Sequence, residues 1–138
     1  MKEINAYLIF NGNCREAMTF YQKCLGGDLR VTTFGDMPGD IPPEAKDKIA
    51  HARITKGGKP ILMASDNMGG PPVQPGENFF VAVACESAQE TEKLFAALSA
   101  KGKTKMPPQE TSWAERFTMF TDQFGINWML NCEKPMQQ

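Results

Sequence analysis

The chain carries one local pattern twice, and this repeat limits the available folds more than any other feature of the sequence. Asn13 is followed three residues later by Glu16, and Ser87 is followed in the same way by Glu90. Both pairs open a run with apolar residues on one helical face, and the corresponding positions are 74 residues apart. An apolar stretch precedes each run and a glycine follows it. The repeat therefore predicts two copies of one strand-and-helix unit.

The length and the charge of the chain exclude several classes of partner. A chain of 138 residues can form one compact domain, or two small halves that share a core. The net charge of −1 gives no basic surface for nucleic acid or for an anionic membrane. No apolar run approaches the roughly 20 residues of a membrane span, and the first residues do not form a signal-peptide core. We predict a cytoplasmic protein with neither nucleic-acid nor membrane partners.

The four cysteines do not form a metal or redox motif. Cys14, Cys24, Cys85 and Cys132 have no CxxC spacing and lie within apolar helix or strand patterns. Neither a zinc knuckle nor a thioredoxin-like site is therefore available. We expect reduced thiols that are mostly buried.

The first half of the chain predicts one helix among four strands. Residues 4–10 are rich in strand formers, and Asn13 is predicted to cap a helix that ends near Leu25. The four strands are predicted at residues 4–10, 29–33, 49–56 and 60–65. A long acidic loop is expected at 35–48, and Gly57-Gly58 is a hairpin signal.

The second half predicts the same order of elements after a stretch with linker composition. One helix is predicted at residues 87–100. The four strands are predicted at residues 79–85, 103–106, 113–121 and 126–131. Ser87 and Glu90 are expected to form a capping box, and Pro107-Pro108 a break. The predicted fold class is α+β, with two tandem βαβββ modules at residues 1–66 and 78–138 and a linker at 67–77.

Several local strings resemble one known family over nearly the whole chain. These are YLIFNGNCREA at 7–17, IAHAR at 49–53, MASD at 63–66, WA at 113–114 and TDQFGINW at 121–128. They resemble the vicinal oxygen chelate superfamily, which comprises glyoxalase-like, bleomycin resistance protein-like and dioxygenase-like proteins, and more specifically its PhnB-like branch. The resemblance implies a curved mixed sheet around a cavity between the modules, usually in a homodimer and sometimes with modules exchanged between chains.

The resemblance also implies where a divalent metal would be held. In typical members the first and last strands of each module supply the ligands, and here those positions fall near Ala6, Phe80, Met129 and within 62–64. None of these residues is a hard-oxygen or imidazole ligand. No cofactor is therefore predicted, and a divalent metal remains an alternative.

An atypical metal site would have to use other residues. His51 is the only histidine of the chain, and the acidic residues nearest to a cavity mouth are Glu110 and Glu115. Either glutamate would serve as a displaced metal ligand or a general base, although such side chains are more often solvated.

Polar candidates for binding lie on three predicted strands. His51 and Arg53 share one face of a strand by the two-residue period, and would bind a small anionic or oxygen-rich ligand. The alternative is a structural histidine near a dimer interface. Ser65 and Asn131 lie near the ends of the module-closing strands, where they would orient a ligand by hydrogen bonds. Asp66 is expected to cap the turn into the linker.

Apolar candidates complete the predicted site. Trp113, Phe117 and Met129 would line an apolar pocket, although aromatic residues at such spacing more often belong to a core or an interface. No glycine-rich nucleotide loop and no serine-hydrolase motif occurs in the sequence.

Three functions are compatible with these residues. The first is a PhnB-like protein that binds a small organic molecule in the cavity between its modules. The second is a metal-dependent lyase, isomerase or dioxygenase with an atypical site. The third is an interaction protein whose cavity is filled by its own side chains. The sequence leaves open whether any reaction is catalysed.

Overall fold

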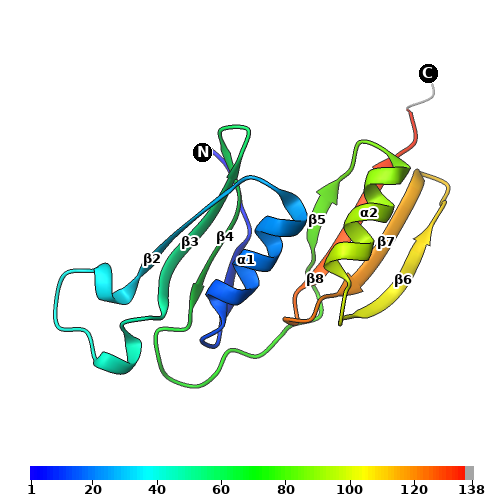
Figure 1. The fold of residues 1–138 in the computed structure, drawn as a ribbon. Helices are drawn as coiled ribbons and strands as arrows, with labels where there is room; N and C mark the ends of the chain where they lie inside the picture. Colours follow the sequence, from blue (N-terminus) through cyan, green and yellow to red (C-terminus); the bar gives the residue numbers. More distant parts are fainter. Residues whose placement is uncertain (136–138) are drawn as a thin grey trace. The chain divides into compact units, whose positions relative to one another are not determined.

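The computed structural model describes residues 1–135, and its contacts divide the chain into two units, Met1–Gln74 and Pro75–Gln138. Each unit contains one four-stranded mixed sheet and one helix that packs on a single face of that sheet (Figure 1). Neither sheet closes into a barrel. The predicted α+β class and the βαβββ order of each module are confirmed.

The first module has the strand order β1-β4-β3-β2. Its elements are β1 (Tyr7–Phe10), α1 (Cys14–Leu25), β2 (Asp28–Thr33), β3 (Ile49–Lys56) and β4 (Lys59–Asp66). Strand β1 runs parallel to β4, and the other neighbours are antiparallel. The predicted acidic loop contains two single-turn 3-10 helices, η1 (Phe34–Asp36) and η2 (Pro43–Ala45). The loop therefore has more local structure than its composition indicated.

The second module repeats this topology with the order β5-β8-β7-β6. Its elements are β5 (Val81–Ala84), α2 (Ala88–Leu98), β6 (Lys103–Gln109), β7 (Ala114–Thr121) and β8 (Asn127–Glu133). Strand β5 is parallel to β8, and the remaining pairs are antiparallel. No helix within residues 1–135 has both the length and the apolar character required to cross a membrane.

Each helix is held on its sheet by an apolar stripe at helical spacing. Ala17, Met18 and Tyr21 of α1 are fully buried, and the ring of Tyr21 contacts that of Phe10 on β1. In the second module, Phe95 of α2 meets the ring of Phe120 on β7 at 5.6 Å between centroids. Burial of each large apolar side chain contributes about 1.5–3 kcal/mol. These contacts identify the helix-covered face of each sheet.

The N-terminus of α1 is capped by a different residue from the one predicted. Asn13 makes no side-chain capping bond. Instead, Oδ1 of Asp66 accepts hydrogen bonds from the backbone N–H groups of Gly12 and Cys14, at 3.0 and 2.9 Å. Its Oδ2 accepts from Ile49 N–H at 2.8 Å. The predictions of an Asn13 cap and of Asp66 in the turn toward the linker are both wrong, because the carboxylate lies within reach of three backbone donors.

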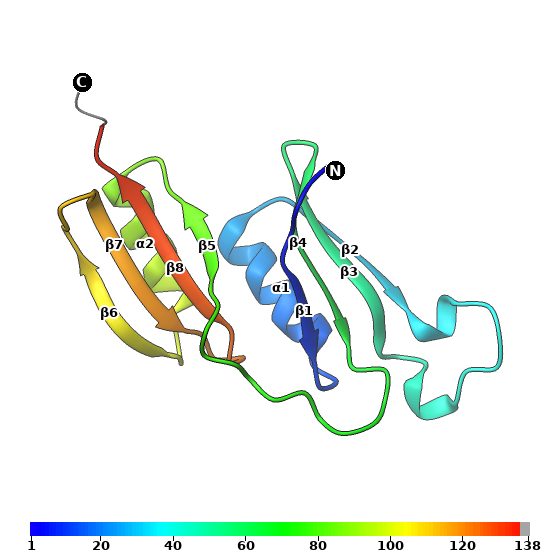
Figure 2. The same cartoon turned by 180° about the vertical axis from the view of Figure 1, so that it is seen from behind.

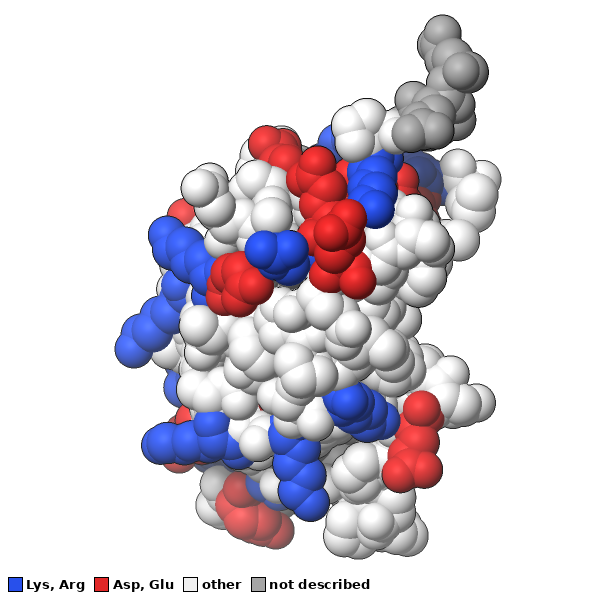
Figure 3. Space-filling model, turned by 90° about the vertical axis from the view of Figure 1, so that its right-hand side faces the viewer, with Lys and Arg blue, Asp and Glu red and all other residues white. Residues whose placement is uncertain are grey.

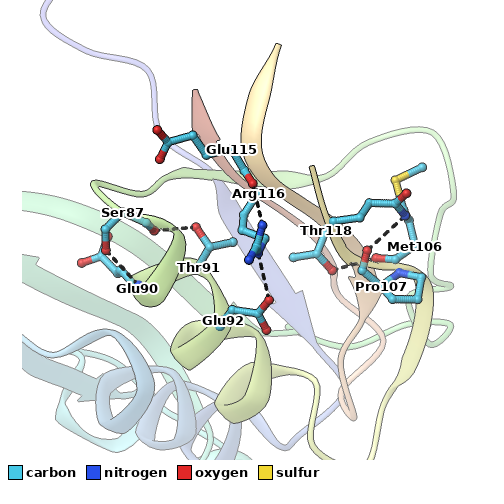
Figure 4. Close-up of polar contacts among 10 residues, drawn as sticks. Ser87, Glu90, Thr91, Glu92, Met106, Pro107, Glu115, Arg116 and Thr118 are labelled. Atoms are coloured by element: carbon cyan, nitrogen blue, oxygen red, sulfur yellow. Dashed lines mark hydrogen bonds and ion pairs between the residues drawn. The ribbon is translucent and has the colours of Figure 1, made fainter. Parts of the chain in front are cut away.

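Helix α2 begins close to the expected residue. Ser87 Oγ accepts the Glu90 N–H at 3.0 Å, which is one half of the predicted capping box (Figure 4). The Glu90 carboxylate accepts from Glu86 N–H, one residue before the position that a regular box uses.

The predicted break at Pro107-Pro108 is wrong. Strand β6 continues through both prolines to Gln109, with register shifts on either side of Met106. Because β6 is an edge strand, residues without an N–H are tolerated there. The hydroxyl of Thr118 donates to the Met106 carbonyl oxygen at 2.8 Å and attaches this irregular part to β7 (Figure 4).

The second half of the segment with linker composition is hydrogen bonded to residues of both modules. Asn11 forms a reciprocal pair of bonds with the backbone of Val73, at 3.0 and 2.9 Å. Asn127 donates to the carbonyl oxygen of Gly76 at 2.9 Å. Val73 is therefore attached to the first module and Gly76 to the second.

Candidate functional site

One face of each sheet carries no helix of its own module, as Figure 2 shows from behind. We call it the open face. In the first module the helix-covered face contains the buried residues Leu8, Phe10, Ala52, Ile54, Leu62 and Ala64. The alternating residues of the same strands point to the open face.

The registers align the open-face residues of the first module in rows across all four strands. One row is Tyr7, Met63, Arg53 and Arg30, because each residue is paired with the next. On the adjoining row, His51 is paired with Thr32, and Ser65 with Ile9. The predicted candidates His51, Arg53 and Ser65 therefore lie on one face.

His51 is held by a residue that sequence reasoning did not select. The hydroxyl of Tyr7 lies 3.0 Å from Nδ1 of His51, and the rings stack at 5.7 Å between centroids. This hydrogen bond occupies Nδ1 and leaves Nε2 as the other ring nitrogen. His51 consequently presents Nε2, in an orientation fixed by Tyr7, to the open face.

Arg30 and Arg53 face each other directly across β2 and β3. Both are exposed, and within residues 1–135 neither forms an ion pair. Arg116 of the second module differs, since its Nε donates to the carboxylate of Glu92 at 3.1 Å (Figure 4). The arginine pair of the first open face therefore keeps its donors available.

The open face of the second module is apolar at the matching positions. Its corresponding row is Ala82, Met129, Met119 and Met106, again paired residue by residue. The next row contains Ala84, Asn131, Phe117 and Gln109. In the second module, Met106 and Met119 thus occupy the positions of Arg30 and Arg53. Met129 and Phe117 occupy the positions of Met63 and His51.

Two further features belong to the second open face. Trp113 is 53% exposed and meets the ring of Phe117 at 5.5 Å between centroids. Oδ1 of Asn131 is buried and lacks a hydrogen-bond partner among residues 1–135. Four predicted candidates, namely Trp113, Phe117, Met129 and Asn131, therefore lie together.

The repeat offset differs between helices and first strands. At an offset of 74, Leu8 and Phe10 would match Ala82 and Ala84, yet the former are buried and the latter exposed. An offset of 75 restores the match, because Leu8 then corresponds to Val83 on the helix-covered face. Ala6 and Phe80 are therefore not equivalent, since by this offset Phe80 corresponds to Asn5.

The residues at the expected metal positions do not fit a divalent ion. Met129 and its row counterpart Met63 carry thioethers, which are poor ligands for hard ions. Glu110 is ion-paired with Lys134 at 2.7 Å, and this contact lowers its pKa. Glu115 lies 3.6 Å from the Cys132 thiol. Within residues 1–135 no three His, Cys, Asp or Glu side chains form a group able to hold a metal.

Comparison with known proteins identifies the class to which this fold belongs. The sequence model of the Glyoxalase/Bleomycin resistance protein/Dioxygenase superfamily matches residues 3–130, and the chain belongs to this superfamily. Protein YjdN of Escherichia coli K12 is 34% identical over 142 residues, covering 95% of each chain.

Solved structures agree with this assignment. PA1353 from Pseudomonas aeruginosa is 44% identical with a TM-score of 0.83, over 95% of this chain and 98% of that one. A PhnB protein from Bacillus cereus, titled a putative 3-demethylubiquinone-9 3-methyltransferase, has 23% identity and a TM-score of 0.75 over 95% and 99%. FosX from Listeria monocytogenes, solved with Mn(II) and a dihydroxypropylphosphonic acid, has 14% identity and a TM-score of 0.62 over 98% and 95%. The last two likenesses concern the fold alone.

Proposed function

We propose that this protein binds a small organic molecule on the open faces of its sheets. The observation that carries the proposal is the row of Tyr7, Met63, Arg53 and Arg30 with His51 beside it. These side chains offer several hydrogen-bond donors on a face without a helix. Small-molecule sites commonly combine a few such polar groups with apolar walls.

The second open face supports an apolar contact. Methionine side chains adapt to irregular ligand shapes, and Met106, Met119 and Met129 form a continuous row. Trp113 and Phe117 add aromatic surface. Asn131 adds one amide side chain to this face, and its buried Oδ1 has no partner among residues 1–135. Taken by itself, the first open face suits an oxygen-bearing ligand, and the second open face, taken by itself, suits an apolar one.

The surface charge favours a small ligand over a polyanion. In the view of Figure 3, acidic and basic side chains are mixed with one another above and below an uncharged area. The net charge is −1. A long nucleic acid needs a continuous basic surface, and this side of the molecule has none.

Thermal shift and tryptophan fluorescence test the proposal. The probes are catechol, benzoate and the thiol adducts of small dicarbonyls. A ligand at about 100 times its Kd stabilises the folded state by about 2.7 kcal/mol, so the melting temperature rises. Trp128 is fully buried and Trp113 is exposed, so quenching reports on Trp113. In Trp113→Phe the quenching should vanish while the thermal shift remains.

Two results would contradict the proposal. If no probe shifts the melting temperature or changes the fluorescence at millimolar concentration, small-molecule binding of this class is contradicted. A shift of the same size in His51→Ala and Phe117→Ala would place binding away from both open faces.

We also propose a homodimer as the assembly. Strands β1, β2, β5 and β6 each have one unpaired edge within their own sheets. Unpaired edges favour association with another chain. Sedimentation velocity should give the mass of two chains, and a single-chain mass at all working concentrations would contradict the dimer.

A further inference from the structure

We infer that the first open face contains an oxyanion subsite, formed by Arg30 and Arg53 with Thr32 and His51 at its side. The inference rests on the proposed function and specifies its ligand. The ligand class is a small organic acid whose carboxylate or phosphate-like group accepts hydrogen bonds from both guanidinium groups.

The two arginines lie directly opposite each other on neighbouring strands. They form a directly opposed antiparallel pair, where Cβ atoms lie about 4.5–5.5 Å apart and like charges repel. Asp28 lies two residues from Arg30 on the same strand face, yet forms no ion pair with either arginine. Within residues 1–135 no carboxylate lies within ion-pairing distance of either guanidinium group, and a bound anion would reduce the repulsion between them.

The second module supplies an internal comparison. The row position of Arg53 is taken there by Met119, and that of Arg30 by Met106. The same topology therefore forms with apolar residues at both places. The fold therefore does not require charge at these two places, and the two arginines are available to bind a ligand.

The neighbouring donors define the geometry of the subsite. A guanidinium group presents five N–H donors in a planar fork that matches an oxyanion. His51 is paired with Thr32 on β2, one row away from the arginines, and its Nδ1 is occupied by Tyr7. Its Nε2 and the Thr32 hydroxyl are consequently left for the ligand. Two cations beside one acidic residue suit a single small oxyanion.

Anion titration of the full chain tests the subsite. Inorganic phosphate and acetate are titrated separately by NMR, because they distinguish a tetrahedral oxyanion from a carboxylate. Arg30→Gln and Arg53→Gln should each weaken binding of the preferred anion about tenfold or more, the loss expected for a charge-assisted hydrogen bond. Arg15→Gln removes an exposed arginine from α1 and should leave affinity within about twofold of the parent.

Unfolding without anion separates binding from a structural role. Removal of either arginine relieves repulsion, so the melting temperature of Arg30→Gln should equal or exceed that of the parent chain. A lower melting temperature with unchanged anion affinity would show that the pair is structural and would overturn the subsite.

The remaining outcomes distinguish this inference from the proposed function. If benzoate binds with equal affinity to the parent, Arg30→Gln and Arg53→Gln, the subsite is wrong and the proposed function stands. If Arg15→Gln loses as much affinity as the open-face variants, the attraction is a general surface effect and the subsite is also wrong. If phosphate or acetate binds as described and no organic probe does, the subsite stands without the proposed function.

Discussion

Asp66 connects three segments of the first module. Its side chain is 2% exposed, and its two oxygens accept three backbone N–H groups from the β1–α1 turn, the start of α1 and the start of β3. A buried carboxylate with this many donors joins segments that are distant in sequence. The same position of the second module carries Cys132, which makes no such bonds to backbone donors.

Replacement of Asp66 by asparagine tests this role. The amide nitrogen cannot accept a hydrogen bond, so at least one buried N–H loses its partner at a cost of about 1–3 kcal/mol. Urea unfolding should show the loss. Asp40→Asn, at an exposed loop position, is the control and should change the free energy of unfolding by less than about 0.5 kcal/mol. Equal stability of both variants would contradict the role of Asp66.

The Cys14 thiol predicts an alkaline limit to stability. Burial, reinforced by the charge of Asp66, raises the pKa of Cys14 from 9.0 to about 12. In the unfolded chain the thiol ionises near its ordinary pKa, whereas the folded chain retains the proton. The free energy of unfolding should therefore fall as pH rises above about 9, by up to about 1.4 kcal/mol per pH unit from this group.

Cys14→Ala isolates that contribution. The variant loses stability at neutral pH because a buried group is removed, but its alkaline slope should be shallower than that of the parent. Cys24→Ala, which retains Cys14, is the control and should keep the parental slope. Identical slopes in all three chains would refute the assignment.

Single residues were predictable where local periodicity decides their direction. His51 and Arg53 lie on one face because side chains alternate along a strand. Tyr7 and Arg30 were not selected, since only the pairing of β1 with β4 and of β2 with β3 brings them to the same face. Asn13 has the residue type of a helix cap, but Asp66, 52 residues from Cys14, provides the bond.

At the scale of elements, the exit from α1 depends on close backbone approach. Gly27 has a φ of +92°, and a Cβ placed there would lie 2.6 Å from the backbone oxygen of Thr55 on β3. Gly57, in the β3–β4 turn, also has a positive φ, of +61°, but no atom within 4 Å of such a Cβ. A side chain at Gly57 would therefore meet backbone strain alone, whereas one at Gly27 would meet strain and steric overlap together.

Alanine substitution at both positions should give unequal losses. Gly57→Ala is expected to cost about 1–2 kcal/mol for the left-handed conformation alone. Gly27→Ala should cost about 2–4 kcal/mol, because the backbone must also move away from Thr55. The free energies of unfolding from urea titration provide the comparison. A Gly27→Ala loss no larger than that of Gly57→Ala would refute the close approach.

Elements were predictable where their signals are local, and less so at sheet edges. Helices α1 and α2 begin within a residue of the expected positions, because polar starts and apolar stripes define them. Strand β6 was predicted to end before Pro107, but the edge position removes the need for an N–H on one side. Strands β1 and β5 are shorter than their apolar stretches, since pairing with β4 and β8 sets their length.

For the whole molecule, the duplication has produced two sheets of one topology with different open faces. The register that gives Arg53 and Arg30 in one module gives Met119 and Met106 in the other. The repeat predicted the shared topology from sequence. The contrast between the two open faces could be found only from the strand pairing. The repeat offset is 74 residues in the helices and 75 in the first strands, and a difference of one residue along a strand moves the match to the opposite face.

The most direct test of ligand binding on the open faces is an amide NMR titration of the full chain with benzoate. The account predicts that the largest chemical-shift changes occur on the first open face, at Arg30, Thr32, His51 and Arg53. Residues on the outer surface of α1 and α2 should remain unchanged. Changes centred on the helices, or no saturable change at any residue, would contradict the account.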